Sequence, residues 1–470
     1  MNEKTHDTIA AVATGCGVGG IGIVRISGPQ AKEILSQMFL PLSSRFVNFR
    51  PWVLHRGRIL DANNEPLDDV LAVYMPGPRT FTGEDVAEIQ CHGGHFLVQA
   101  VLESVIGRGA RPAERGEFSR RAFVNGRMDL SQAEAVAEMI AAPSREALRY
   151  GLNRLDGLLG QRVQALREEL DVLRAQVCLA VDFPEEEVPE LKADVFCAQV
   201  DGVIQSVRRL LAGSRRAGLM QHGARVVLAG AVNAGKSSLL NALLGRNRAL
   251  VTDVPGTTRD FLEETCVIDG LPVCLTDTAG LRHASEAVER LGVARSREKL
   301  TDADAIVLVL DGAQLGGAGA AAVQCPDPAA REVLETAGNL PLLAVWNKSD
   351  LGTPETFPPR WLGARECYAV SALRGDGIDM LAQRLRALLL ADGCGMVPEE
   401  GLAPNARQAL ALEDALHELV ALRADVNAGQ SYDCCAVRLD LAAEHLGQVI
   451  GISSPAQILD TVFAQFCIGK

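Results

Sequence analysis

Long apolar stretches are missing from this chain of 470 residues. No uncharged apolar run reaches about 18 residues, the length that a membrane-spanning helix needs, so a transmembrane span is excluded. The first residues, MNEKTHD, are polar and lack the apolar core of a secretory signal. Basic residues are also in deficit, because 46 of them stand against 59 acidic residues and give a net charge of −13. The chain is therefore not expected to coat nucleic acid, and a nucleic-acid partner would need a local basic patch.

Cysteine pairs of the CxxC type are absent as well. The 12 cysteines and 8 histidines are scattered along the chain, so no zinc-binding spacing is present. The tightest cluster, Cys91-His-Gly-Gly-His95, is more typical of a turn than of a metal site. Unpaired thiols and a polar start together favour a reducing compartment, and we expect the protein in the cytoplasm.

The first half of the chain shows two kinds of pattern. Residues 1 to about 120 mix short β-like runs with glycine-rich turns, which predicts an α+β region; the runs are Ile21–Ile26, Val70–Tyr74 and Val86–Gln90. From about 130 to 218, apolar residues recur every three or four positions, as on one face of a helix. The clearest stripe is Leu159, Val163, Leu166, Leu170, Leu173 and Val177. It fits a bundle core or a dimer seam, and the core is the simpler interpretation.

The second half alternates apolar runs with helical segments, which predicts a parallel sheet covered by helices. The runs are Arg225–Ala229, Val273–Thr276, Ile306–Leu310, Leu342–Trp346 and Cys367–Val370. A helical period returns after about residue 385, so we expect the α/β segment to be inserted into a helical domain. The predicted fold class is multidomain α/β, with an N-terminal α+β domain (1–125), a discontinuous helical domain (126–218 and 385–470) and an inserted Ras-like P-loop domain (219–384).

The strongest motif is Gly230-Ala-Val-Asn-Ala-Gly-Lys-Ser237, which fits GxxxxGK[ST] between a predicted strand and a predicted amphipathic helix. Glycines let backbone N–H groups approach phosphates, and the helix N-terminus adds the positive end of its dipole. Lys236 is expected to reach the β- and γ-phosphates, and Ser237 to bind Mg²⁺. The nucleotide contacts expected from this loop are Asn233, Ala234, Gly235, Lys236, Ser237 and Ser238.

Three further motifs follow in the order of a guanine nucleotide site. The residues Asp277, Thr278, Ala279 and Gly280 come after a predicted strand, where they can meet Mg²⁺ through water and the γ-phosphate. In the motif Asn347, Lys348, Ser349 and Asp350, the carboxylate can accept N–H groups from guanine N1 and N2, a pair that adenine lacks. The run Ser371, Ala372 and Leu373 can offer backbone N–H groups to guanine O6. The ordered set indicates GTP as the substrate and disfavours an ATPase.

Thr258, in Gly256-Thr-Thr-Arg-Asp260, is the candidate switch threonine, which meets Mg²⁺ and the γ-phosphate only in the triphosphate state. Hydrolysis needs a group that orients water, but the position that often holds a glutamine is Leu281 here, which cannot do so. Four candidates remain from the residues alone: Arg282, His283, Glu286 and Glu289. Asn233 is well placed to ligate a monovalent cation between the phosphates.

The last residues, Phe466-Cys-Ile-Gly-Lys470, resemble the MnmE (TrmE) family of tRNA-modification GTPases. Other segments that resemble the family are Asp7–Ala11, Thr82–Gly94, Gly116–Phe123, Asp129–Ala135 and Asp182–Glu186. The resemblance implies a homodimeric GTPase with an N-terminal folate-binding domain. It also implies a heterotetramer with an FAD-dependent partner, MnmG, that installs a carboxymethylaminomethyl or aminomethyl group at C5 of the wobble uridine in certain tRNAs. A GTPase switch in ribosome assembly is the alternative, and the N-terminal domain and the tail disfavour it.

Residue roles follow from the same resemblance. Contacts with a tetrahydrofolate derivative, in a 5-formyl or methylene form, are implied for Arg25, Glu88, Arg127 and Lys470, with Cys467 beside them in an open chemical role. The implied potassium ligands are Asn233, Thr252, Val254 and Thr257, of which Thr252 and Thr257 also contact the nucleotide. Glu289 corresponds to the family's water-orienting glutamate, which decides between the four candidates. Potassium then stands where an arginine finger would, and the G domains pair across the dimer.

The chain departs from the family's pattern near its N-terminus. The family's usual Thr-Pro-Pro-Gly-Arg-Gly-Gly reads Thr14-Gly-Cys-Gly-Val-Gly-Gly20 here, so a rigid loop becomes a glycine-rich one. The usual lysine at 127 is an arginine, which turns a point charge into a planar fork. A basic cluster stands in the same region, and it is expected to meet tRNA phosphate, the folate glutamate tail or solvent. Its members are Arg111, Arg115, Arg120, Arg121 and Arg127.

Overall fold

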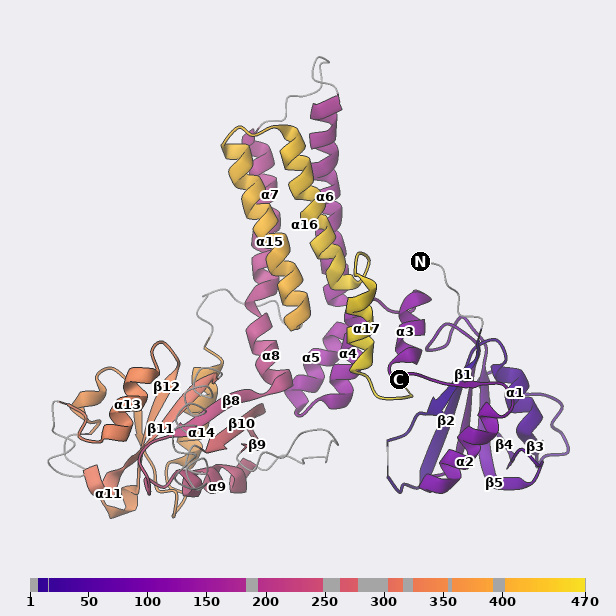
Figure 1. Cartoon of the computed structure of the whole chain (residues 1–470), viewed down its shortest axis with the longest axis horizontal. Coiled ribbons are helices and arrows are strands. Elements are labelled where there is room, and N and C mark those ends of the chain that lie inside the picture. Colours follow the sequence, from indigo (N-terminus) through magenta and orange to yellow (C-terminus); the bar gives the residue numbers. More distant parts are fainter. Residues whose placement is uncertain are drawn as a thin grey trace, which may run out of the picture. The chain divides into compact units, whose positions relative to one another are not determined.

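The structure is a computed structural model that describes residues 7–15, 17–182, 193–247, 263–277, 303–315, 324–353, 357–391 and 402–469. The chain forms two compact units (Figure 1). The first unit comprises residues 1–140, 154–204 and 410–470, and the second comprises 141–153 and 205–409. Within the described ranges, no helix is both long and apolar enough to cross a membrane.

A seven-stranded sheet forms the N-terminal part of the first unit, in the order β3-β4-β5-β6-β2-β1-β7. Neighbouring strands are antiparallel except β1 and β7, which run parallel. Helices α1 (Ala31–Met38) and α2 (His95–Ile106) pack on the sheet and bury its apolar core. The three predicted strands are confirmed within β2, β5 and β6. The strands are β1 (Ile9–Val12), β2 (Ile21–Ser27), β3 (Phe39–Pro41), β4 (His55–Leu60), β5 (Pro66–Met75), β6 (Val86–His92) and β7 (Arg111–Pro112).

Four long helices form a bundle, most of which belongs to the same unit (Figure 1). The predicted apolar stripe lies on α6, and all six of its side chains are at most 2% exposed. The most extensive helix packing joins α6 to α16. The stripe is therefore the core of this bundle, which confirms the simpler of the two interpretations. The helices are α6 (Leu158–Asp182), α7 (Ala193–Ala212), α15 (Ala406–Asn427) and α16 (Tyr432–Ile450).

Shorter helices connect this bundle to the N-terminal sheet: α3 (Glu117–Val124), α4 (Leu130–Ala141) and α17 (Ala456–Ala464). Their apolar side chains form one cluster that includes Leu130, Phe463 and Phe466. Gly116 has a left-handed backbone against the Phe463 carbonyl, and a side chain there would collide with that carbonyl. The C-terminal tail is therefore packed closely against the start of α3.

The second unit contains a six-stranded sheet in the order β13-β12-β11-β8-β10-β9. All five predicted strands are present and run parallel, which confirms the parallel sheet. The sixth strand, β9, is antiparallel to β10 and was not predicted. It belongs to a hairpin whose turn, Asp269-Gly270, has positive φ at both residues, and this Asp-Gly pair is the signal that the sequence analysis overlooked. The strands are β8 (Ala224–Ala229), β9 (Glu263–Ile268), β10 (Leu271–Asp277), β11 (Ala305–Asp311), β12 (Leu342–Asn347) and β13 (Cys367–Ala369).

Helices pack on this sheet and bury its strands. Every residue of β11 is buried, as expected for a central parallel strand with both faces covered. The predicted strand–loop–helix order around the phosphate loop is present as β8, the loop and α9. The helices described in this unit are α5 (Arg145–Leu155), α8 (Ser214–His222), α9 (Lys236–Asn247), α11 (Gly312–Leu315), α13 (Pro328–Thr336), α14 (Ile378–Leu389), η2 (Ser349–Leu351) and η3 (Arg360–Leu362).

Candidate functional site

The phosphate loop has the backbone shape that its sequence predicts. Gly230, Asn233 and Gly235 all have positive φ, at 143°, 64° and 91°. A side chain at Gly230 would collide with the carbonyl of Val309, and one at Gly235 with the amide of Asn347. Glycine is therefore required at both positions by close approach as well as by dihedral angle. The loop curls back directly in front of the first turn of α9.

Lys236 is the first residue of α9 and is only 5% exposed. Its ammonium group donates to the carbonyl oxygens of Gly230, at 3.0 Å, and of Ala231, at 2.7 Å. These contacts hold one positive charge against the loop, where phosphate oxygens would approach. Ser237 and Ser238 follow in the first turn and are exposed, as is Asn233 in the loop.

Asn347, the first residue of the predicted base-recognition motif, joins three segments. Its side-chain N–H donates to the carbonyl of Ala234 at 2.9 Å, and its side-chain oxygen accepts from the backbone N–H of Ala372 at 3.1 Å. The side chain is only 2% exposed. The phosphate loop and the loop after β13 are therefore held together by one buried amide, which the sequence did not predict.

Asp350 and Ser371 are brought into direct contact. The hydroxyl of Ser371 donates to Oδ1 of Asp350 at 2.6 Å, and this hydrogen bond holds the pKa of the Asp350 carboxyl below its ordinary value. Ser349 in the same motif donates its backbone N–H to Val370 at 3.0 Å. Leu373 is 87% exposed at the rim. The residues predicted to read guanine therefore lie on two loops that are bonded to each other.

One acidic residue of this site was missed by the sequence analysis. Lys348, which has a left-handed backbone at φ 63°, donates its ammonium to Oδ2 of Asp311 at 2.8 Å. Asp311 is only 3% exposed and stands at the carboxyl end of β11, paired in register with Asn347 of β12. An acid directly after a buried apolar run is the signal that could have found it.

Several predicted site residues lie outside the described part of the chain. They are Thr252, Val254, Thr257, Thr258, Thr278, Ala279, Gly280, Glu289 and Lys470. Asp277 ends β10, whose backbone is described. The structure thus describes the phosphate loop and the two loops expected to bind the guanine base, which follow β12 and β13.

Arg25 and Glu88, two predicted folate contacts, are cross-strand partners on β2 and β6. The guanidinium Nε donates to Glu88 Oε1 at 2.8 Å, and both side chains are less than a fifth exposed, at 18% and 17%. The Arg25 guanidinium also lies over two rings, 5.7 Å from Phe81 and 5.9 Å from Phe118. The pair therefore sits in a half-buried, aromatic-lined place on the sheet.

The C-terminal tail reaches the same sheet. Ile468 forms a β-bridge with Arg115, and Gly469 approaches the backbone of Val12 on β1 so closely that a side chain would not fit. Cys467 is exposed. Arg127 donates its Nε to the carbonyl of Thr80 at 3.0 Å.

The expectation of an open basic cluster is wrong for Arg121, which is buried among acids. Arg121 is 3% exposed and bonds the carboxylates of Asp7, Glu84 and Glu117. Arg111 bonds Asp7 and Glu117 as well. Arg120 pairs with Asp460 at 3.3 Å on the surface. Carboxylates within the same unit therefore take up the buried guanidinium of Arg121, whereas the side chain of Arg111 stays 42% exposed.

The Cys91-His-Gly-Gly-His95 cluster forms a strand end rather than a convergent set of ligands. Cys91 is buried, donates to the carbonyl of Gly22 at 3.4 Å, and burial raises its pKa to about 11. His92 faces Asp68, with Nδ1 at 2.8 Å from Oδ1. No group of three potential ligands for a metal converges anywhere in the described ranges.

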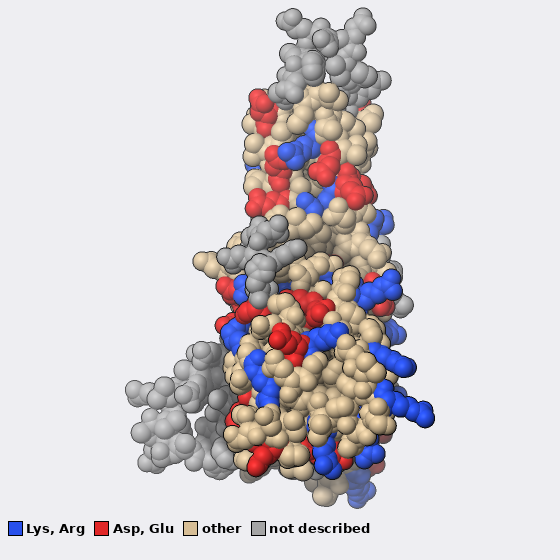
Figure 2. All heavy atoms as spheres, turned by 90° about the vertical axis from the view of Figure 1, so that its right-hand side faces the viewer, with Lys and Arg blue, Asp and Glu red and all other residues tan. Residues whose placement is uncertain are grey.

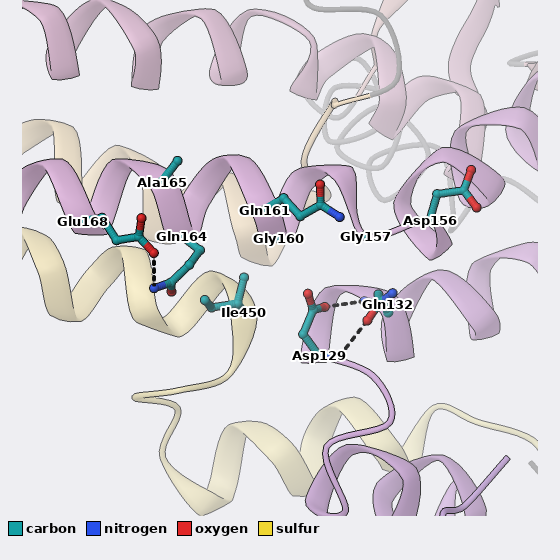
Figure 3. Close-up of a pocket in the computed structure, with 10 residues that line it drawn as sticks. All are labelled: Asp129, Gln132, Asp156, Gly157, Gly160, Gln161, Gln164, Ala165, Glu168 and Ile450. Atoms are coloured by element: carbon teal, nitrogen blue, oxygen red, sulfur yellow. Dashed lines mark hydrogen bonds between the residues drawn. The ribbon is translucent and has the colours of Figure 1, made fainter. Parts of the chain in front are cut away.

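A polar cavity of about 450 Å³ lies between the starts of α4 and α6 (Figure 3). Asp129 and Gln132 on its wall cap α4, because each side chain accepts from the other residue's backbone N–H, at 2.8 and 2.9 Å. Gln132 also donates to the carbonyl of Leu155 at 2.8 Å. Gly160 leaves room for the Asp129 carboxylate. The Asp129-Leu-Ser-Gln132 motif is thus explained as a helix cap.

Comparison with known proteins agrees with this arrangement. A family described as "GTP-binding protein TrmE N-terminus" matches residues 8–127, and one described as "MnmE helical domain" matches residues 130–467. A tRNA modification GTPase MnmE of Nitratidesulfovibrio vulgaris is 56% identical over 465 residues, 99% of each chain. The protein of that name from Lawsonia intracellularis is 46% identical over 473 residues, 99% of this chain and 100% of its own.

Among solved structures, the G domain of the T. maritima FeoB iron transporter is 22% identical over 35% of this chain and 98% of its own, at a TM-score of 0.25. That score supports no argument about function. The full-length relatives and the two matching family models show that the chain belongs to the MnmE family of tRNA modification GTPases.

Proposed function

We propose that this chain hydrolyses GTP in the course of modifying C5 of the wobble uridine, position 34, in tRNA. The observation that carries the proposal is the buried amide of Asn347, which bonds both the phosphate loop and the base-side loop at Ala372. The relatives named as tRNA modification GTPases supply the class of RNA. Because the substrate is a tRNA, we place the reaction in the cytoplasm. The proposal includes an N-terminal domain (1–125), a helical domain in two segments (126–218 and 385–470) and an inserted G domain (219–384).

The described residues fit a nucleotide with Mg²⁺. The glycines at 230 and 235 leave the loop open to phosphate oxygens, and the ammonium group of Lys236 lies directly beside that loop. The exposed hydroxyl of Ser237 is the Mg²⁺ ligand that we assign here, with Thr258 as the second. When bound, Mg²⁺ neutralises charge on the β- and γ-phosphates. We assign Asp350 to guanine N1 and N2, and Ala372 to O6.

Potassium dependence is the first prediction. Asn233 presents an exposed amide in the phosphate loop, and Thr252, Val254 and Thr257 complete the proposed ligand set. A cation there would replace an arginine finger, so GTP turnover should be at least about tenfold faster in KCl than in NaCl at equal ionic strength. Steady-state phosphate release measures it, with nucleotide affinity in both salts as the control. Equal turnover in the two salts would refute the site.

Glu289→Ala is the second prediction. If Glu289 orients the attacking water, its loss should lower the rate of GTP cleavage by at least about a hundredfold and leave GTP affinity unchanged. Single-turnover cleavage and binding of a fluorescent GTP analogue separate the two effects. Glu286→Ala is the matched control, since Glu286 is the neighbouring candidate, and it should retain cleavage. A loss of affinity without a loss of cleavage in Glu289→Ala would contradict the role.

The second part of the proposal is a folate site on the N-terminal sheet. The half-buried Arg25–Glu88 pair, with its guanidinium over two aromatic rings, fits a ligand with a flat polar ring and an anionic tail, and Arg127 and the C-terminal tail lie on the same unit. A tetrahydrofolate derivative, when bound, supplies the one-carbon unit. An FAD-dependent MnmG partner and homodimerisation complete the proposed assembly. We leave Cys467, which is exposed, as the candidate for direct chemistry.

Two experiments test this function. Binding of 5-formyltetrahydrofolate to the full chain should be lost when Lys470 is removed. Failure of both forms to bind would favour a GTPase switch without one-carbon chemistry. In a strain that lacks its own relative, this chain should restore the modified nucleoside at position 34, measured by mass spectrometry of digested tRNA, and Lys236→Ala should not. Unmodified position 34 with the intact chain would reject the proposal.

A further inference from the structure

One stretch of the N-terminal domain has the opposite charge balance to the rest of the chain. Between Ile34 and Leu60 there are four arginines and no acidic residue, although the net charge of the protein is −13. The arginines are Arg45, Arg50, Arg56 and Arg58, and all are exposed. They lie on β4 and on the loop before it, beside β3, the last strand of the sheet. This is a local basic patch of the kind that an RNA partner requires.

Little of this positive charge is neutralised. Arg58 and Arg56 share a single carboxylate, Asp69 on β5, at 2.9 and 3.6 Å. Within the ranges that the structure describes, no carboxylate pairs with Arg45 or Arg50. In this respect the patch differs from Arg111 and Arg121, whose guanidinium groups are taken up by acids.

An exposed tryptophan stands among these arginines. Trp52 is 55% exposed and occupies a turn closed by the N–H of Val53, which donates to the carbonyl of Arg50 at 3.2 Å. Its φ is 64°, in the region where such a turn favours glycine. Both exposure and backbone therefore disfavour a tryptophan here on grounds of stability alone. The ring is presented to solvent at the centre of the basic segment.

The segment beneath Trp52 is held in place. The rings of Phe46 and Phe49 pack edge-on against His55, with centroids 5.1 and 5.3 Å away. The backbone N–H of Arg50 donates to the His55 ring at 3.0 Å, and that of Trp52 donates to the Tyr74 carbonyl at 2.9 Å. Figure 2 views the side of the domain on which β3 and β4 lie in Figure 1, and Lys and Arg side chains project from its right and lower rims. The turn is thus a preformed platform.

We propose that the Arg–Trp patch, formed by Arg45, Arg50, Trp52, Arg56 and Arg58, binds a single-stranded loop of the tRNA. An unstacked base lies on the Trp52 ring, and the arginines contact the neighbouring phosphates. Single-stranded RNA is recognised in this way, by aromatic stacking together with cationic groups along the backbone. A second copy of this chain, or an apolar peptide, would not account for four exposed arginines that share a single carboxylate. The identity of the RNA as a tRNA rests on the proposed function.

The sharpest variant is Trp52→Gly, because it removes the ring and relieves the left-handed backbone. We expect it to keep or raise the melting temperature, while the Kd for a fluorescently labelled tRNA transcript rises about 5- to 150-fold, the value of one base–aromatic stack. Trp52→Phe should retain most of the affinity, since a phenyl ring also stacks. Arg50→Ala should lower the slope of log Kd against log salt by roughly 0.7 to 1. Full-length protein and fluorescence anisotropy are used throughout.

Intrinsic fluorescence gives a second readout. The chain has three tryptophans, and Trp346 is fully buried. A 12-nucleotide single-stranded RNA should quench the wild-type emission, the same sequence as a duplex should quench it less, and Trp52→Phe should show neither change. Quenching that persists in Trp52→Phe would overturn stacking at this site.

Matched controls remove a similar side chain elsewhere. Phe96, which is 86% exposed, and Arg360, an exposed arginine of the second unit, should each be replaceable by alanine without loss of RNA affinity. Unchanged affinity in Trp52→Gly and Arg50→Ala would overturn the patch while leaving the proposed function standing. A fall in oligomeric state in Trp52→Gly, seen by sedimentation, would overturn it in favour of a contact between copies. No tRNA binding by the unaltered chain would reject both the patch and the tRNA function.

Discussion

Replacing Asp350 by asparagine is expected to turn the protein from a guanine-binding into a xanthine-binding one. The carboxylate can accept both N–H groups of guanine, whereas an amide offers one acceptor and one donor, which match N1–H and the C2 carbonyl of xanthine. Two hydrogen bonds to a charged group are worth about 1.5–3 kcal/mol each. The ratio of affinities for GTP and XTP should therefore change by about 10²- to 10⁴-fold.

Two features of the structure make this substitution informative. The Ser371 hydroxyl that donates to Asp350 at 2.6 Å can donate equally to an amide oxygen, so the loop is expected to keep its shape. The same bond keeps the pKa of the carboxyl low, so guanine affinity should stay constant as the pH falls from 7 to about 5. Calorimetric titration with GDP and XDP measures the change. Asp269→Asn, at the exposed tip of the β9–β10 hairpin, is the matched control, and an unaltered preference in Asp350→Asn would place the base elsewhere.

The parts of the fold that could be predicted are those with a local signal. The runs of β8, β11 and β12 are buried strands because nearly all of their side chains are apolar, and all seven residues of β11 are buried. The stripe on α6 repeats at the helical period, so its burial also follows from neighbouring residues alone. The phosphate loop belongs to this class, since its glycines and the helix after it are contiguous.

Contacts between distant loops could not be predicted. The Asn347 amide bonds Ala234, which lies 113 residues earlier, and only the placement of β11 between β8 and β12 brings the two loops to one edge. The Asp311–Lys348 pair depends on the same strand order. Sequence identified Asn347 as a base-binding residue, and the structure adds that its side chain also holds the phosphate loop in position.

The basic cluster also depends on contacts between residues far apart in the sequence, and here the prediction from neighbouring residues failed for Arg121. Arginines that are close in the sequence predicted an open positive face, but the acids that surround Arg121 include Asp7 and Glu84, which lie 114 and 37 positions away. The sign of a surface cannot be judged from one segment when folding brings other charges to it.

Arg121→Ala is expected to destabilise the first unit by about 3–5 kcal/mol, the range for removing one partner of a buried ion pair. The guanidinium is only 3% exposed and bonds three carboxylates, as well as the backbone carbonyl of Asp7 at 2.9 Å. Without it, Glu84 keeps a hydrogen bond from Ser27 but loses its cation. Chemical denaturation of the full chain measures the effect. Arg120→Ala is the matched control, since its exposed pair with Asp460 is worth at most about 1 kcal/mol.

The pH dependence separates this network from a packing defect. Burial alone would raise the pKa of Glu117, but hydrogen bonds from Arg111 and Arg121 outweigh it, and the net pKa lies below the ordinary value of 4.5. The pKa of Asp7 is lowered in the same way, by hydrogen bonds and charge from Arg111 and Arg121. A depressed carboxylate stabilises the fold above its unfolded pKa and loses that contribution as the pH falls through the folded one. The destabilisation by Arg121→Ala should therefore be complete at pH 7 and shrink progressively below about pH 4.5. A loss that is the same at pH 3.5 and pH 7 would show that Arg121 acts through its volume and not through its charge.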